Sequence, residues 1–253
     1  MQFPGSIAGG HALSADAPGR GGARLGRFFV ERLIRPDWPA PRPVRAASTL
    51  RGLEPREAWR LLEIPGEPRW LSQMHGRDVV CADADWTEVQ ADGCVSYTPG
   101  RACMLRTADC LPILFCDAAG SRVGAAHAGW RGLASGVIEA TVASLCGGGS
   151  GVIDPRNLMA WIGPGIGGPA YEVGADVFWA ISTSTPDAAQ FFTRRDSTHW
   201  LLDLAGLARH QLRRLGIMDI YGAHWCTFSD PARFHSYRRD GSSARHATFI
   251  WLL

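Results

Sequence analysis

The chain has 253 residues, of which 46% are hydrophobic, and its 26 basic and 24 acidic residues give a formal net charge of +2. This balance argues against a nucleic-acid partner, which requires clustered basic residues, and no apolar run is long enough to span a membrane. Seven cysteines lack the spacing of a disulfide framework, and no signal peptide is evident. We expect a cytoplasmic protein with free thiols.

The first part of the chain differs in composition from the rest. Residues 1–44 are rich in glycine and alanine and end in a proline-rich stretch, which favours an extended backbone. We expect a leader or arm over residues 1–44 and a globular catalytic domain over residues 45–253.

Several short elements are predicted next. Residues 54–64 carry apolar side chains at helical spacing, and short strands are expected on either side of His75–Gly76. Two more strands flank the turn signal at Pro99–Gly100. The runs LPILFCD (111–117) and RVGAAHA (122–128) predict two strands joined by a turn of hairpin length.

The second half alternates helices and strands. Residues 129–146 predict one helix ended by a run of glycines, and residues 158–168 predict a buried strand entering a glycine-rich loop. Asp203 is a predicted N-cap of a following helix. Because the elements interleave without a strict βαβ repeat, we expect an α+β fold with mixed α/β layers.

Cys110 and His127 lie at the margins of the two hairpin strands, and His75 lies in the turn QMHG. One cysteine and two histidines are the ligand set of a catalytic zinc that keeps a fourth position open, and the same atoms suit copper. The three residues are 35 and 17 positions apart, unlike a zinc finger. Taken singly, each is more often a turn or core residue.

A second interpretation needs no metal. Cys110 could serve as a nucleophile with His127 as its base. Asp109 or Gln73 would then orient or polarise the pair. Residue spacing leaves both interpretations open.

Candidate groups for substrate binding surround these residues. Trp130 offers a flat face for a base or sugar, and Arg131 lies in the first turn of a predicted helix. In SYRRDGSSAR, Arg238 and Arg245 lie on a predicted hairpin from which several arginines could hold an anion. Alternatively, Trp130 is a core residue and the arginines are solvated surface charges without a role in binding.

Eight short motifs occur in an order that resembles the YfiH-like family, also described as laccase-like multicopper polyphenol oxidases or purine nucleoside phosphorylases. The resemblance covers residues 70–253, and the tandem of TADC and HAGWRG is its most specific part. The motifs are QMHG (73–76), TADCLP (107–112), HAGWRG (127–132), IGPGI (162–166), YEV (171–173), LDL (202–204), CT (226–227) and SYRRDG (236–241).

The resemblance implies a single α/β/β/α-type layered domain, distantly similar to cysteine-hydrolase toxin domains. It implies zinc bound by His75, Cys110 and His127. It further implies phosphorolysis of purine nucleosides (adenosine, inosine, guanosine or methylthioadenosine) with adenosine deamination as a side activity. On this interpretation purine nucleoside and phosphate are the partners, and Arg131 and Arg245 hold the phosphate. Asp109, the acid expected nearest to the metal, would protonate the purine or position a hydroxyl.

Three alternatives remain. The first is a zinc or Cys–His amide hydrolase that edits peptidoglycan precursors. The second is a metal-binding protein without turnover. The family has additional segments that help to build its pocket, and here only residues 50–72 stand in their place. A copper-dependent polyphenol oxidase ranks below these, since multicopper sites use close H-x-H pairs and none occurs among the eight histidines.

Overall fold

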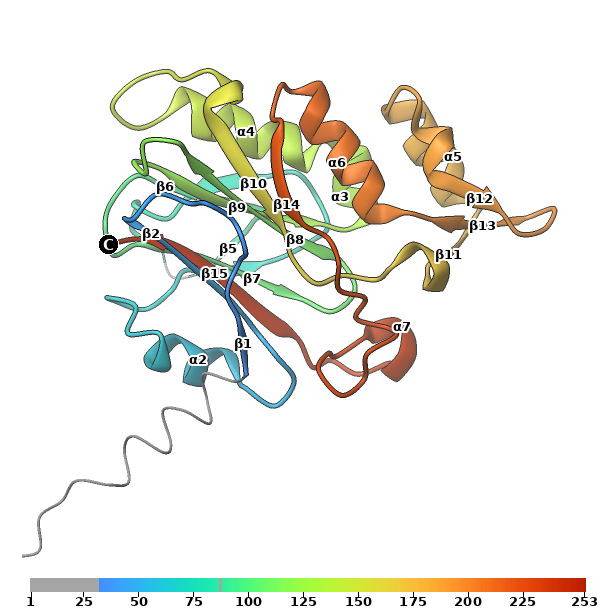
Figure 1. Cartoon of the computed structure of the whole chain (residues 1–253), viewed down its shortest axis with the longest axis horizontal. Coiled ribbons are helices and arrows are strands. Elements are labelled where there is room, and N and C mark those ends of the chain that lie inside the picture. Colours follow the sequence, from blue (N-terminus) through green and yellow to red (C-terminus); the bar gives the residue numbers. More distant parts are fainter. Residues whose placement is uncertain (1–31, 87) are drawn as a thin grey trace, which may run out of the picture.

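The longest strands are apolar at nearly every position because both of their faces are covered. The computed structural model describes residues 32–86 and 88–253, and most strands belong to two sheets that lie face to face (Figure 1). In β15 (His246–Leu252), Phe249 and Trp251 pack on one side, whereas Ile250 and Leu252 pack between the two sheets. Strands buried on both faces read as continuous hydrophobic runs.

One sheet has four strands in the order β1-β2-β15-β7. Its outer face is covered by α2 (Pro55–Leu61), whose Ala58 is buried beside Met104 and Phe249. The remaining strands are β1 (Leu33–Ile34), β2 (Val44–Thr49) and β7 (Ala102–Thr107).

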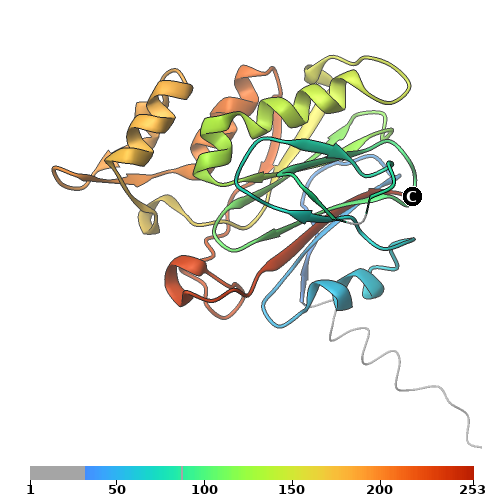
Figure 2. The ribbon, with the colours of Figure 1, turned by 180° about the vertical axis from the view of Figure 1, so that it is seen from behind.

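The other sheet has six strands in the order β14-β10-β8-β9-β6-β4. Its outer face is covered by three helices, α3 (Trp130–Ser135), α4 (Val137–Gly147) and α6 (Leu204–Arg214) (Figure 2). The resulting order of helix, sheet, sheet and helix confirms the expected mixed α/β layers. The strands are β4 (Val79–Cys81), β6 (Gly93–Ser96), β8 (Leu111–Asp117), β9 (Val123–Ala128), β10 (Leu158–Ile162) and β14 (Asp219–Gly222).

Smaller elements complete the described residues. A three-stranded sheet of order β11-β13-β12 carries α5 and extends from one end of the layers (Figure 1). A short parallel pair, β3-β5, lies earlier in the chain. These elements are β3 (Trp70–Ser72), β5 (Glu88–Gln90), β11 (Glu172–Gly174), α5 (Ala175–Ser184), β12 (Phe192–Arg194), β13 (His199–Leu202) and α7 (Tyr237–Asp240).

Most predicted elements are present, and one of the helices needs correction. The 111–128 hairpin is confirmed, since β8 and β9 pair antiparallel. Asp203 caps α6 by accepting a hydrogen bond of 2.9 Å from the Gly206 N–H. The single helix predicted over residues 129–146 is instead two helices, because Gly136 takes a left-handed φ of 88° between them.

Residues 1–31 of the proposed arm lie outside the described residues. The described part of that region contacts the fold: Leu33 pairs with Thr49 across β1 and β2, and Trp38 packs against the core between the sheets. The division into arm and domain therefore stays a proposal for residues 1–31. Over residues 32–86 and 88–253, none of the helices has both the length and the apolar character needed to cross a membrane.

Candidate metal centre

His75, Cys110 and His127 meet at one end of the β8–β9 hairpin. Each offers one ligand atom, and these atoms all lie within 4.8 Å of one another. The two imidazole rings are in edge contact, with centroids 4.7 Å apart and planes at 64°. Three side chains that are distant in sequence therefore converge on one point.

Strand register explains how Cys110 reaches the histidines. Leu111 of β8 pairs with Ala128 of β9, so Cys110 lies opposite Gly129. A Cβ atom on Gly129 would lie 2.7 Å from Cys110 Sγ and 3.2 Å from His75 Cδ2. Because the φ of −79° at Gly129 is open to any residue, glycine is needed here for space and not for backbone conformation.

Asp92 connects the two histidines. It directly precedes β6, and the pairing of Gly93 with Ala126 sets it beside His127. The Asp92 carboxylate lies 2.7 Å from His127 Nδ1. It also accepts three consecutive backbone N–H groups, from residues 74, 75 and 76, at 3.1, 2.9 and 2.6 Å. With Nδ1 facing Asp92, His127 presents Nε2 to the cluster.

The electrostatics favour a thiolate. Burial alone would raise the pKa of the Cys110 thiol, but hydrogen bonds with His127 and His75 lower it to about 6. Burial would lower the pKa of His127, yet its bonds to Asp92 and Cys110 raise it to about 9. Near neutral pH the pair is therefore a thiolate beside an imidazolium, and the thiolate is the form that binds metal.

The donor set fits a metal ion. A thiolate and two imidazoles are ligands that a zinc or copper ion takes, and Gly129 leaves room beside the sulfur. His75 is exposed, Cys110 is partly buried and His127 is buried, so the cluster is open to solvent on the His75 side. Within residues 32–86 and 88–253, no other group of three or more His, Cys, Asp and Glu side chains converges in this way.

Asp109, the acid that the sequence placed next to the metal, directs its carboxylate to other partners, whereas Asp92 bonds to the side chain of His127. The Asp109 carboxylate accepts hydrogen bonds from Thr227 Oγ1 at 2.6 Å, Ser236 Oγ at 3.0 Å and the Arg238 N–H at 2.7 Å. These bonds engage both oxygens and tie two distant segments to the residue before Cys110. The strand register, which the sequence does not disclose, brings Asp92 to the histidines instead.

Gln73 holds the base of the loop that carries His75. Its side-chain amide donates to the Arg106 carbonyl at 2.9 Å and accepts from the Arg106 N–H at 2.8 Å. This two-point contact fixes the end of β3 to β7. A direct role of Gln73 in substrate binding stays a prediction.

Two of the predicted substrate-binding arginines lie near the cluster. The Arg131 guanidinium lies 4.5 Å from the Trp130 ring, and that of Arg238 lies 5.3 Å from the Tyr171 ring. Burial, together with the nearby Cys110 thiol, raises the pKa of Tyr171, whereas Arg238 and Arg131 act in the opposite direction. Tyr171 therefore lies within electrostatic reach of the thiol and both arginines. In the sequence, Tyr171 stands out only as part of the YEV motif.

The predicted hairpin over the arginine-rich segment is wrong. Residues 237–240 form the short helix α7, with Ser236 as its N-cap. A helix points successive side chains in different directions, so Arg238 lies over Tyr171 while Arg239 points into its own loop. Arg245 donates to the carbonyls of Ser242 and Ala244 at 2.9 Å each. The three arginines of this segment do not share one pocket.

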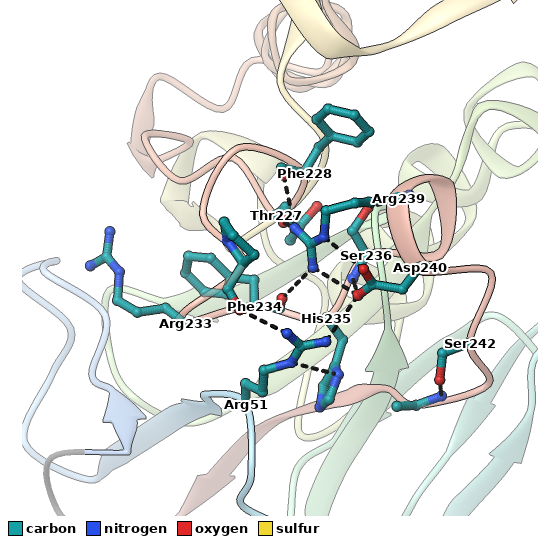
Figure 3. Close-up of polar contacts among 12 residues, drawn as sticks. Arg51, Thr227, Phe228, Arg233, Phe234, His235, Ser236, Arg239, Asp240 and Ser242 are labelled. Atoms are coloured by element: carbon teal, nitrogen blue, oxygen red, sulfur yellow. Dashed lines mark hydrogen bonds and ion pairs between the residues drawn. The ribbon is translucent and has the colours of Figure 1, made fainter.

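Arg239 holds the 227–240 loop in place (Figure 3). Two ion pairs join it and Arg51 to Asp240, at 2.7 and 3.0 Å. Arg239 also donates to three main-chain carbonyls at 2.8 Å each, those of Thr227, Phe228 and Phe234. We call Arg51, Arg239 and Asp240 the arginine cluster. It supports the segment whose Ser236 and Arg238 bind Asp109.

The fold and the cluster define a class: a layered α/β/β/α protein with a His–Cys–His site at one end of its inner hairpin. The chain belongs to the family described as multi-copper polyphenol oxidoreductase laccase, which matches residues 54–253. It is thus a member of the YfiH-like proteins that the motifs indicated.

Curated relatives and solved structures agree. The chain is 38% identical to purine nucleoside phosphorylase YfiH of Escherichia coli, over 88% of this chain and all of that protein. It is 42% identical to a purine nucleoside phosphorylase of Pseudomonas aeruginosa, over 87% of this chain and 98% of that protein. A crystal structure of a Neisseria meningitidis protein matches with a TM-score of 0.78 and 40% identity, over 87% of this chain and 99% of that one. The crystal structure of YlmD from Geobacillus stearothermophilus matches with a TM-score of 0.77 and 27% identity, over 87% of this chain and 96% of that one.

Proposed function

We propose that this chain is a zinc-dependent purine nucleoside phosphorylase. It would act on adenosine, inosine, guanosine or methylthioadenosine, with adenosine deamination as a second reaction. The observation that carries the proposal is the convergence of His75, Cys110 and His127 on a solvent-open point. Relatives that this chain matches over most of their length bear the name purine nucleoside phosphorylase.

Zinc is favoured over copper by the form of the site. Two imidazoles and one thiolate leave a fourth position for water or substrate, as in catalytic zinc sites. A multicopper oxidase needs several ions, whereas one three-ligand group converges in the described part of the chain. Metal analysis of the purified protein distinguishes one zinc per chain from copper.

The metal and the residues around it would have separate roles in the reaction. A bound zinc ion supplies Lewis-acid stabilisation of negative charge that develops in the reaction. Arg131 and Arg238 have exposed side chains near Tyr171, and Arg238 also donates to the Glu172 carbonyl at 2.8 Å. Their guanidinium groups would supply positive charge for the phosphate dianion. Trp130 is partly buried and offers a ring face for the purine. A role for Arg245 in phosphate binding remains part of the proposal.

Asp109 has a positioning role on this proposal. Its carboxylate already accepts three hydrogen bonds from side chains and backbone of the 227–238 segment. Both carboxylate oxygens are occupied by these bonds, which favours a positioning role over direct contact with the substrate. Asp109 instead keeps Arg238 and Cys110 in a fixed relation, since it bonds to one and adjoins the other.

A second candidate function is a thiol amide hydrolase. Asp92, His127 and Cys110 stand in the order of a Cys–His–Asp triad, with the Asp92–His127 contact at 2.7 Å and the thiol bonded to His127. This arrangement favours nucleophilic attack by Cys110 when no metal is bound. A metal-binding protein without turnover is the third candidate. We also propose a cytoplasmic location, since all seven cysteines are free thiols.

The deciding experiment is a product assay with adenosine and varied phosphate. Phosphorolysis yields adenine and ribose 1-phosphate, and its rate rises with phosphate. Deamination consumes water, yields inosine and ammonia, and does not depend on phosphate. An inert zinc-loaded protein would overturn the enzyme proposal. Chelation separates the candidates further, because removal of zinc abolishes phosphorolysis but exposes Cys110 for amide hydrolysis.

A further inference from the structure

We propose that Asp92 is a positioning residue that sets the metal affinity by holding both histidine ligands with one carboxylate. The inference rests on the metal-binding part of the proposed function. It does not depend on which substrate is turned over. Asp92 is 1% exposed and does not belong to the predicted set of site residues.

The two carboxylate oxygens divide their contacts between the histidines. Oδ1 accepts from the His75 N–H at 2.9 Å and faces His127 Nδ1 at 2.7 Å. Oδ2 accepts from the Met74 N–H at 3.1 Å and the Gly76 N–H at 2.6 Å. The backbone of one ligand and the side chain of the other are therefore bound to the same group.

The loop that presents His75 needs such an anchor. His75 has a φ of 60°, a left-handed conformation that a histidine seldom adopts. Its side chain is exposed, so little packing holds the ring at the cluster. The three N–H bonds to Asp92 hold this strained turn, and with it the direction of the His75 side chain.

The contact with His127 fixes which ring nitrogen meets the metal. While Nδ1 donates to the carboxylate, Nε2 carries the lone pair that faces the cluster. Metal-bound histidines commonly have such a carboxylate behind them. Among the described ion pairs, Asp92 meets His127 and no lysine or arginine, so the charge of the carboxylate is available to offset the positive charge of a metal ion.

The substitution Asp92→Asn separates these effects with little change in size. If the new NH₂ group faces His127, the imidazole must accept at Nδ1 and carry its proton on Nε2, which prevents ligation. If the NH₂ group faces residues 74 and 76, two loop N–H groups lose their acceptor. Either orientation weakens one histidine ligand.

Asp83→Asn is the matched control. Asp83 lies beyond the opposite end of β6 and accepts from Ser96 Oγ at 2.7 Å and the Tyr97 N–H at 2.9 Å. It braces the same strand without contacting the cluster. Loss of this carboxylate should lower stability and leave the metal site intact.

The test is zinc affinity, measured by competition with a chelating dye, for the full chain and both variants. We expect Asp92→Asn to weaken zinc binding about 10- to 100-fold, and Asp83→Asn to change it by less than about twofold. With cobalt in place of zinc, the thiolate charge-transfer band should persist in Asp92→Asn while the d–d bands shift. Wild-type zinc affinity and cobalt spectra in folded Asp92→Asn would overturn the proposal.

A measurement on the unaltered protein covers the case in which Asp92→Asn does not fold. Long-range proton–nitrogen correlation spectra of the zinc-loaded chain should show His127 protonated at Nδ1 and metal-bound at Nε2. The opposite assignment would refute the role of Asp92. Neither readout uses a nucleoside, so failure of phosphorolysis and failure of this inference are distinguishable.

Discussion

Two polar clusters of the molecule differ in one respect: whether their hydrogen-bonding groups are already satisfied. In the arginine cluster, Arg239 makes five hydrogen bonds, two to Asp240 and three to main-chain carbonyls (Figure 3). A guanidinium has five N–H donors, so none is left for a substrate. This cluster stabilises a loop.

In the His75–Cys110–His127 cluster, the ligand atoms face one another and a solvent-open side. Outside the cluster, the rear of His127 is held by Asp92. Arginines close together in sequence are therefore weak evidence for an anion site, whereas three metal-ligating side chains that converge on a solvent-open point indicate a binding site.

The largest expected effect is loss of turnover in His127→Ala. Removing this ligand removes the metal and with it Lewis-acid stabilisation worth several kcal/mol, or about 10³-fold in kcat/KM. Zinc content and phosphorolysis should fall together. His210→Ala is the control and should retain both, because His210 is a half-buried residue of α6 that contacts Pro186 and Phe191 instead of the cluster. Full activity of metal-free His127→Ala would contradict the zinc mechanism.

The second prediction concerns the space beside the sulfur. Gly129→Ala places a methyl group 2.7 Å from Cys110 Sγ, and overpacking of this kind costs about 1–3 kcal/mol, or roughly 10- to 100-fold in zinc affinity. Gly147→Ala is the matched control, because its Cβ would meet nothing within 4 Å. Equal zinc affinities for the two variants, measured by dye competition, would show that Gly129 does not shape the site.

Sequence patterns were sufficient to predict the layers and to select the three side chains that meet in the candidate metal site, but for different reasons. The apolar runs of β8, β9 and β15 are local signals of strands buried on both faces. The ligand set, by contrast, gained weight only when the motifs QMHG, TADC and HAGWRG were taken together as a family resemblance. The hairpin turn then accounts for the meeting of Cys110 and His127.

The contacts made by Asp92 could not be predicted from the sequence. They depend on the register of β6 against β9, and a shift of one residue would point the side chain to the other face. The Asp-Gly pair at residues 92–93 signals only a turn. The hairpin predicted for the arginine-rich segment was wrong because a four-residue helix such as α7 is too short to show helical periodicity in the sequence.

The third prediction tests the arginine cluster. Arg239→Ala should lower the free energy of unfolding by about 2 kcal/mol, because it removes several charge-assisted hydrogen bonds to carbonyls that stay partly buried. Zinc affinity should not change. Denaturant unfolding of the zinc-loaded protein measures the first quantity and dye competition the second. A large loss of zinc affinity with normal stability would place Arg239 in the functional cluster instead.

The smallest effect is a pH dependence of stability that arises from a histidine next to the arginine cluster. His246 is 1% exposed and its Nε2 accepts from the His235 N–H at 2.8 Å. Burial, together with the nearby His235 and Arg51, lowers the pKa of His246 from 6.5 to about 4. The unfolded chain therefore binds a proton first as the pH falls. The stabilising contribution of neutral His246 is present above pH 6.5 and is lost as the pH falls toward 4.

Between pH 7 and 5.5 this linkage amounts to about 1 kcal/mol. His246→Gln keeps an acceptor for the His235 N–H but does not titrate. The metal-free wild-type protein should therefore lose about 1 kcal/mol more stability than metal-free His246→Gln over this interval, as measured by denaturant unfolding at both pH values. Using metal-free protein for both removes any contribution from proton competition at His75, Cys110 and His127. Identical pH dependences would show that His246 is not the titrating group.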